Sequence, residues 1–277
     1  MNSAAMPPLT GAEFEDLNAR YLAAFEQGQY EDALRLALEG TQRHATHFYF
    51  WMQASICALY LRRWQDAADW GEWALQFPGA GYSLYDSLAH AYGELKQVDK
   101  VRAFGRQALE QRDIMYGQRV PAPDWPIPPA PAAPDATNTG RNWVALSLFG
   151  DRSKYCETAV LNAELLPDIY PGWSCVVFVD ASVPAHVIQR LHAANAFVQV
   201  VDHEVAQWPG PMWRMLAADL VGAQRVIFRD ADSLISEREA AAVNEWVASG
   251  RAFHIIRDSG SHTELLLAGF WGMVVGA

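Results

Sequence analysis

The amino-acid sequence predicts an all-α domain of helical repeats followed by an α/β domain with a mainly parallel sheet. Three observations lead to this prediction. A short motif recurs every 34 residues in the first part of the chain. A proline-rich stretch then interrupts every regular period, and beyond it apolar runs alternate with amphipathic stretches. We therefore expect repeats over residues 1–116, a linker over 117–141 and a second domain over 142–277.

The repeats are visible as three copies of one motif. Tyr30, Trp64 and Val98 begin the related segments YEDA, WQDA and VDKV, and successive copies are 34 residues apart. Small residues recur with the same period, which suits paired helices that approach closely; these are Ala37, Gly71 and Gly105, and likewise Gly40, Ala74 and Ala108. Each motif follows an amphipathic segment, so the sequence predicts three helical hairpins whose first helices fall at about 11–27, 47–62 and 81–95.

The period and the motif resemble tetratricopeptide repeats over about 105 residues. The third copy is weaker, because Val98 replaces the aromatic residue and Val101 replaces the alanine of the motif. The resemblance implies a concave groove that holds a peptide or protein partner. A helical spacer or a dimerisation surface is the alternative.

The linker prediction depends on composition. Residues 117–140 contain seven prolines and show neither a helical nor a strand period. Such a sequence favours extended polyproline II, which acts as a semi-rigid spacer between domains. A ligand segment for an SH3-type module is the alternative.

The overall composition excludes some classes of protein. Acidic residues outnumber basic ones by 32 to 21 and no Lys/Arg cluster is present, so the sequence predicts no binding of nucleic acid. The three cysteines lie far apart in apolar runs, which favours buried thiols over disulfides or zinc ligands. The N-terminus lacks the features of a secretion signal, and no stretch approaches the ~20 apolar residues of a membrane span. We expect a soluble, cytoplasmic protein without a transmembrane segment.

The second domain shows a strand and helix alternation. Apolar runs fall at 143–149, 175–179, 197–201, 225–228 and 252–256. Helical stretches follow at 153–166, from about 183, at 211–221 and at 236–248. Continuously apolar strands are typical of a parallel sheet covered on both faces, and such sheets bind ligands at the carboxyl ends of their strands.

Acidic residues follow three of these predicted strands. Asp151 comes after the first, Asp180 after the second, and Asp230 and Asp232 after the fourth. Two carboxylates separated by one small residue can share a divalent cation, manganese or magnesium, which then neutralises a bound diphosphate. Solvated loop acids, or a helix entry from Asp232 to Glu237, are the alternative reading of this triplet.

The residues around the triplet resemble a known family. The segment MWRMLAADLVGAQRVIFRDADSLIS, residues 212–236, closely resembles the helix, strand and acidic DxD motif of GT-A type glycosyltransferases. The likeness is greatest to family 8 and related bacterial lipopolysaccharide sugar transferases. It implies a Rossmann-like sheet and a metal-dependent glycosyltransferase with a nucleotide-diphosphate sugar as donor and a protein or glycan as acceptor. Asp230 and Asp232 would then be the metal ligands.

Weaker matches at 147–173 and 175–180 extend the resemblance, as does the segment at 268–276. The residues it would place against the nucleotide sugar are Gly150, Asp151, Lys154, Tyr155, Asp180, Arg214, Asp230, Gly269 and Trp271. Arg214 would reach the donor phosphates, with a surface salt bridge as its alternative role. Asp258 and Glu264 are the candidates for the catalytic carboxylate near the anomeric carbon.

The sequence departs from the family at its end. Family 8 enzymes usually continue further and supply a third metal ligand, often histidine, whereas this sequence ends at Ala277. The resemblance therefore implies a domain that is truncated at its C-terminus.

Two other functions remain open. The main rival is a non-catalytic tetratricopeptide scaffold with a degenerate nucleotide-sugar-binding domain. A catalyst should show both acids of the triplet facing one open cleft with Arg214 and Asp180 on its walls, whereas a scaffold could pair these side chains internally. A different phosphoryl or nucleotidyl transferase is the third possibility, but no glycine-rich phosphate loop supports it.

Overall fold

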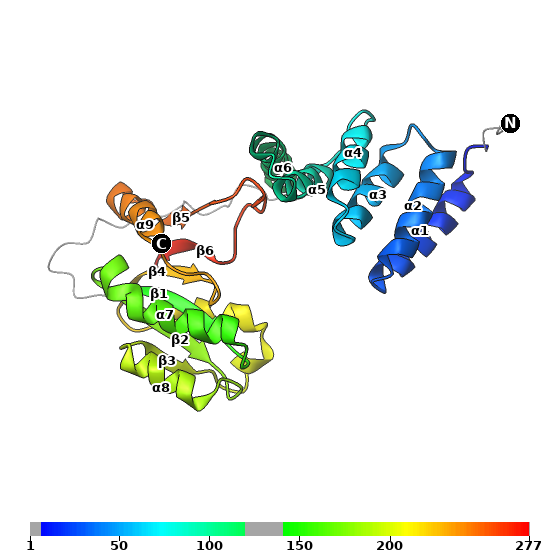
Figure 1. The fold of residues 1–277 in the computed structure, drawn as a ribbon. Helices are drawn as coiled ribbons and strands as arrows, with labels where there is room; N and C mark the ends of the chain where they lie inside the picture. The colour runs from blue at the N-terminus through cyan, green and yellow to red at the C-terminus, as the bar shows by residue number, and fades with distance from the viewer. Residues whose placement is uncertain (1–6, 120–140, 277) are drawn as a thin grey trace. The chain divides into compact units, whose positions relative to one another are not determined.

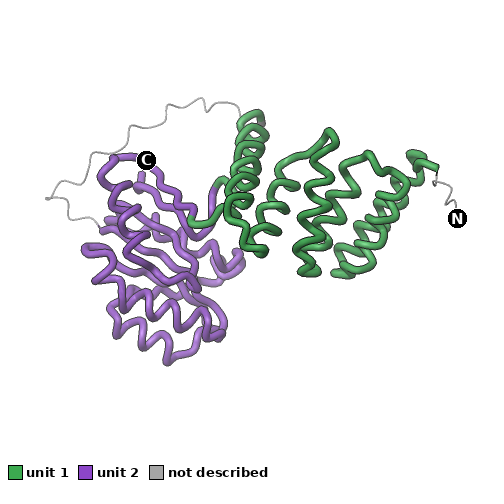
Figure 2. Tube along the Cα trace, turned by 45° about the horizontal axis from the view of Figure 1, so that its top comes forward, with its two compact units in different colours: residues 1–123, 258–265 green, residues 124–257, 266–277 purple. Residues whose placement is uncertain are grey.

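The computed structural model describes residues 7–119 and 141–276. The chain forms two compact units, coloured green and purple in Figure 2. The helical unit comprises residues 1–123 and 258–265, and the sheet unit comprises residues 124–257 and 266–277. Most of the predicted polyproline linker falls outside the described residues. The segment 258–265 was predicted within the second domain, yet it packs with the helical unit.

The helical unit consists of three successive helical hairpins (Figure 1). Its helices are α1 (Gly11–Glu26), α2 (Tyr30–Arg43), α3 (Phe48–Tyr60), α4 (Trp64–Ala74), α5 (Tyr82–Glu94) and α6 (Val98–Arg119). The second helix of each hairpin begins at a motif residue, Tyr30, Trp64 or Val98. The 34-residue period therefore corresponds to one hairpin per repeat, and the predicted tetratricopeptide-like fold is confirmed.

Small residues at the repeat positions allow the helices to pack closely. Ala37 of α2, Ala74 of α4 and Ala108 of α6 are fully buried. Gly40 of α2 lies against the ring of Phe50 of α3, and that ring is also fully buried. Because protein interiors are packed as densely as organic crystals, the space beside such residues is already filled.

Gly40 provides a test of this packing. A methyl group at Gly40 would overlap the Phe50 ring. We expect Gly40→Ala to lower the free energy of unfolding of the helical unit by about 1–3 kcal/mol, because overpacking shifts the backbone or strains a rotamer. Gly93→Ala on α5 is the matched control, since nothing lies within 4 Å of its added methyl and alanine favours helix by up to about 1 kcal/mol. Equal thermal stability of the two variants would contradict the predicted overlap.

The sheet unit contains a mixed sheet of six strands in the order β3-β2-β1-β4-β6-β5. The strands are β1 (Arg141–Leu148), β2 (Trp173–Val179), β3 (Phe197–Val200), β4 (Ala223–Arg229), β5 (Phe253–Ile255) and β6 (Phe270–Val274). Neighbours among β3, β2, β1 and β4 are parallel, whereas β6 runs antiparallel to both β4 and β5. The sequence predicted a mainly parallel sheet, and the described strands form a mixed one, in which β6 has the reversed direction that the sequence did not reveal.

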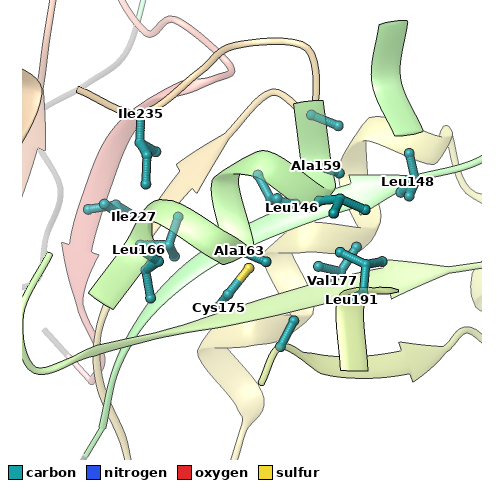
Figure 3. Close-up of a cluster of buried hydrophobic side chains, with 14 of the residues drawn as sticks. Leu146, Leu148, Ala159, Ala163, Leu166, Cys175, Val177, Leu191, Ile227 and Ile235 are labelled. Atoms are coloured by element: carbon teal, nitrogen blue, oxygen red, sulfur yellow. The ribbon is translucent and has the colours of Figure 1, made fainter. Parts of the chain in front are cut away.

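Both faces of the sheet are covered. The helices α7 (Ser153–Ile169), α8 (Ala185–Ala193) and α9 (Glu237–Ser249) pack on one face, where Leu146, Val177 and Ile227 meet Ala163 and Leu191 (Figure 3). The 3₁₀ segment η2 (Gly210–Asp219) covers the other face, where it packs against a cluster that includes Trp143, Phe178 and Phe228. The strands are therefore apolar on both sides, as the sequence pattern indicated.

One predicted helix differs in kind. Residues 211–221 were expected to form an α-helix, but η2 is a 3₁₀ helix, preceded by the short 3₁₀ turn η1 (Val205–Gln207). The backbone N–H of Arg214 donates to the hydroxyl of Ser147 on β1 at 2.9 Å. This hydrogen bond ties η2 to β1 of the sheet.

Two further expectations concern the cysteines and the membrane. Cys57, Cys156 and Cys175 are all free and buried, as predicted. Burial raises the pKa of the Cys175 thiol to about 12, so this group stays a neutral thiol. Within the described residues, no helix has the length and apolar character that crossing a membrane requires.

Candidate functional site

The carboxyl ends of β1 and β4 form one side of a cleft in the sheet unit. β1 and β4 are parallel neighbours, with Leu146 opposite Arg229, so the residues that follow these two strands lie at the same edge of the sheet. The cleft has a volume of about 630 Å³, within the range of about 300–1,000 Å³ typical of ligand sites. Five predicted site residues line it: Gly150, Asp151, Tyr155, Asp230 and Asp232. Both acids of the triplet therefore face one cleft.

Asp230 is held by a buried arginine. Nη1 of Arg214 lies 2.7 Å from Oδ1 of Asp230 and also donates to the carbonyl oxygen of Arg229 at 2.6 Å. The side chain of Arg214 is only 2% exposed, whereas that of Asp230 is 45% exposed. The alternative reading of Arg214 as a surface salt bridge is wrong, because its guanidinium lies behind Asp230 and pairs with the carboxylate from the protein side.

Asp232 is paired with a lysine from the first turn of α7. Nζ of Lys154 lies 2.6 Å from Oδ2 of Asp232, and this hydrogen bond raises the pKa of Lys154. The lysine side chain is 68% exposed, so solvent competes for it. Each acid of the triplet thus has one oxygen engaged with a cationic side chain from the sheet unit.

Asn162 of α7 holds the turn that follows the triplet through two hydrogen bonds to its backbone. Its side-chain amide donates to the carbonyl of Ser233 and its side-chain oxygen accepts the N–H of Ile235, both at 2.9 Å. Asn162 is fully buried. Because a buried amide that has lost its partners is costly, this bridge keeps the turn in one conformation.

Asp180 bridges the ends of β2 and β1. Its Oδ1 accepts from the backbone N–H of Ser182 at 3.0 Å and from the Ser182 hydroxyl, and that hydroxyl oxygen accepts the N–H of Gly150 at 2.6 Å. Asp180 is not among the residues that line the cleft. It is placed to shape the Gly150 loop, where the positive φ of +74° favours glycine.

Gly269 directly precedes β6, and Trp271 lies within it. A methyl group at Gly269 would overlap the carboxylate of Asp230, so the backbone passes directly beside this acid. The Trp271 ring packs on Phe228 of β4 with ring centroids 4.4 Å apart. Gly269 is thus brought to the triplet, whereas Trp271 contributes to the core on the η2 face.

Asp258 and Glu264 are placed with the helical unit and not with the sheet unit that carries the triplet. Oδ1 of Asp258 lies 2.7 Å from Nδ1 of His262. Oε2 of Glu264 lies 2.7 Å from Nη1 of Arg112, a buried residue of α6. Asp258 is thus paired with a residue close in sequence, and Glu264 with a residue of the repeats. The catalytic role of both carboxylates stays a prediction.

The donor set of the cleft fits a hard cation only in part. Among the residues that the structure describes, no three His, Cys, Asp or Glu side chains gather into a group that could hold a metal ion. Asp230 and Asp232 supply two carboxylates. Magnesium commonly binds with one or two protein carboxylates, water and substrate phosphates, so these two residues would suffice once a diphosphate contributes oxygens.

Sequence reasoning missed the buried polar residues that support the triplet. Arg229 and Glu239 form an ion pair at 2.9 Å, with side chains 2% and 7% exposed, and Tyr170 donates to the same glutamate at 3.0 Å. Burial is the main cause of the raised pKa of Tyr170. The signal in the sequence was the arginine at the end of an apolar strand, directly before the first acid of the triplet.

In comparisons with known proteins, the chain matches solved structures but no family model and no curated sequence. The structures similar to it include the tetratricopeptide domain of Arabidopsis OM64, at 20% identity over 35% of this chain and 80% of that one, with a TM-score of 0.34. The second such domain of human RPAP3, in complex with an HSP70 peptide, has 15% identity over 34% and 79%, with a TM-score of 0.33.

A third similar structure is an O-GlcNAc transferase from Thermobaculum terrenum. The two chains are 14% identical, with a TM-score of 0.37. The match covers 81% of this chain and 47% of the transferase chain, so this chain spans about half of that protein's length. These likenesses are remote in identity and in TM-score. The repeat and sheet assignments rest on the helix spacing and strand pairing of this chain itself.

Proposed function

We propose that the sheet unit binds a nucleotide-diphosphate sugar together with a divalent cation and transfers the sugar to a protein or glycan acceptor. The observation that carries this proposal is the shared cleft: Asp230 and Asp232 line it together with Gly150 and Tyr155 of the segment after β1. A diphosphate placed there would meet two carboxylates through a cation and a backbone loop from the neighbouring strand. The resemblance of residues 212–236 to GT-A glycosyltransferases supports the same function.

Each group in the cleft then has a definable task. A manganese or magnesium ion held there would supply positive charge against the leaving diphosphate. Asp230 and Asp232 would hold this ion through the oxygens that Arg214 and Lys154 leave accessible. Lys154, which pairs with Asp232 in the absence of a cation, would be free to reach a phosphate oxygen once Asp232 held the ion. Tyr155 and Phe149 offer aromatic surface in the cleft on which a nucleobase can stack.

In this proposal the helical unit recruits the acceptor or a partner protein, as the tetratricopeptide-like fold suggests. Arg112 with Glu264 and Asp86 with Thr263 already hold the segment 258–265 on α5 and α6. Asp258 and Glu264 remain the proposed carboxylates for stabilisation at the anomeric carbon, and their roles require a test separate from that of the triplet.

A second candidate function is a non-catalytic scaffold that senses a nucleotide sugar or only stabilises an assembly. The pairing of both triplet acids inside the unit favours it, since Asp230 is engaged by Arg214 and Asp232 by Lys154. The scaffold reading predicts that these ion pairs persist in solution with cation present. The transferase reading predicts that the cation displaces Lys154 from Asp232.

A thermal-shift titration separates the two candidates. The protein is heated with UDP, GDP, CDP and ADP, each with and without manganese. Under the transferase proposal one diphosphate raises the melting temperature by several degrees only when manganese is present, because a ligand at 100 times its Kd stabilises the native state by about 2.7 kcal/mol. Release of the free diphosphate from the matching sugar donor then reports turnover. Manganese-dependent binding without turnover supports a sensor, and no shift with any pair contradicts the proposed site.

A further inference from the structure

The carboxylate of Asp230 has a neighbour on each side. Arg214 holds Oδ1 at 2.7 Å. On the other side the backbone of Gly269 passes so close that an added methyl would overlap Cγ and Oδ2 of the same carboxylate. The rotamer of Asp230 is therefore set by an attraction from Arg214 and by steric contact with the chain that enters β6. Only a small movement of Gly269 is needed to change where Oδ2 points.

Gly269 is in turn held by Arg229. Nη1 of Arg229 donates to the carbonyl oxygen of Gly269 at 3.0 Å, and Nη2 donates to the hydroxyl of Ser233 at 3.0 Å. One guanidinium thus bonds to the two segments beside the triplet. These are the turn after Asp232 and the backbone before β6. Cζ of Arg229 also lies 4.2 Å from the centroid of the Phe270 ring, which adds a cation–π contact at the start of β6.

The position of Arg229 excludes a direct contact with a ligand in the cleft. Its side chain is 2% exposed and is neutralised by Glu239 of α9, which is 7% exposed. Arginine suits this task better than lysine, since a planar fork of donors reaches three acceptors in fixed directions. A buried ion pair of this kind adds little net stability compared with apolar packing, so its presence beside the triplet calls for another reason.

From this arrangement we infer that Arg229 is a positioning residue for the cation and diphosphate site, acting on Asp230 through the carbonyl of Gly269. The inference rests on the proposed function for the identity of the ligand. Arg214 sets one oxygen of Asp230, and the Arg229 to Gly269 contact keeps the other oxygen directed past β6 toward the cleft. Loss of either contact lets the carboxylate rotate and weakens cation binding without removing a ligand.

The test uses the full chain and manganese with UDP, GDP, CDP or ADP as the probe. Gly269→Ala pushes the Asp230 carboxylate aside while leaving every donor of Arg229 in place. Arg229→Lys keeps the charge near Glu239 but loses the fork. We expect each variant to raise the Kd for the manganese–diphosphate pair about 10- to 100-fold, the usual effect of residues that orient metal ligands. Gly93→Ala on α5, whose added methyl meets nothing within 4 Å and whose backbone does not need a positive φ, is a control for substitution of a glycine.

The double variant distinguishes positioning from general destabilisation. If Arg229 acts through Gly269, the effects of Gly269→Ala and Arg229→Lys on Kd will not add, because the second change acts on a carboxylate that is already displaced. A purely structural role would lower the melting temperature and leave the Kd of the folded protein unchanged. Carboxyl NMR of Asp230, identified by its loss in Asp230→Asn, reports the displacement without any ligand and should change in both single variants.

The outcomes separate the inference from the function on which it rests. If wild type binds a manganese–diphosphate pair and both single variants bind it equally well, the positioning role is overturned and the proposed site stands. If wild type binds none of the four pairs, the proposed function is overturned, and with it the ligand role of Arg229. Weaker, non-additive binding by the variants together with a changed Asp230 signal supports the inference.

Discussion

The Asp230→Asn protein is expected to lose its manganese-dependent response to the nucleoside diphosphate. Asparagine keeps an oxygen that can accept from Arg214 but removes the charge that a hard cation requires. The loss of one charged ligand interaction of about 1.5–3 kcal/mol corresponds to roughly a 10- to 150-fold weaker Kd. The variant should also lose about 1–3 kcal/mol of stability, because the guanidinium of Arg214 is only 2% exposed and loses its counter-charge. The Kd is therefore compared on the folded protein, below the melting temperature of the variant.

Asp168→Asn is the matched control for this experiment. It makes the same change of charge on the exposed surface of α7, at the end of the helix opposite Tyr155. The control should bind the manganese–diphosphate pair as wild type does. If Asp230→Asn and Asp168→Asn bind equally tightly, the cation does not use Asp230, and the proposed transferase site is wrong.

We expect Glu239→Ala to lower the free energy of unfolding of the sheet unit more than any other single substitution proposed here. Removing Glu239 leaves the guanidinium of Arg229 buried without a counter-charge and takes the acceptor from the Tyr170 hydroxyl. Breaking a buried pair in this way costs about 3–5 kcal/mol. Hydrogen exchange of the β1 and β4 amides measures the effect on this unit specifically, since these core strands open only on global unfolding of the unit.

Two comparisons make the result specific. Glu245→Ala changes an exposed glutamate on the same helix and should alter the free energy of unfolding by less than about 0.5 kcal/mol. Replacing both partners, as in Arg229→Met with Glu239→Leu, removes the unpaired charge and should recover much of the lost stability. Recovery of stability without recovery of manganese–diphosphate binding would agree with Arg229 acting as a positioning residue. A Glu239→Ala protein as stable as Glu245→Ala would contradict the buried pair.

The fold was largely predictable because its signals are local. The repeated motifs mark helix starts at Tyr30, Trp64 and Val98, and the apolar runs after residue 141 mark the strands. Both periods follow from the geometry of a single helix or strand, so a window of the sequence contains them. The reversed direction of β6 was not predictable in this way, because its pairing with β4 depends on how a distant segment returns to the sheet.

The candidate site was predictable only in its outline. The acids of the triplet follow an apolar strand, and the carboxyl end of such a strand is where ligands bind, so Asp230 and Asp232 could be selected from their neighbours in sequence. Arg214 was selected as well, but for a contact with phosphate and not for its buried pairing with Asp230. Arg229, Glu239 and Asn162 carried no pattern that distinguishes a buried polar residue from a solvated one.

The sequence alone determined the order of the two folds, the 34-residue repeat and the strand end that carries the acids, since each depends on residues close together in the chain. Tertiary structure decided which groups surround those acids. Gly269 reaches Asp230 across 39 positions of the chain, and Arg229 meets the carbonyl of Gly269 across 40. Contacts of this length arise from strand pairing and from the burial of charge, and neither is encoded in any short stretch of the sequence.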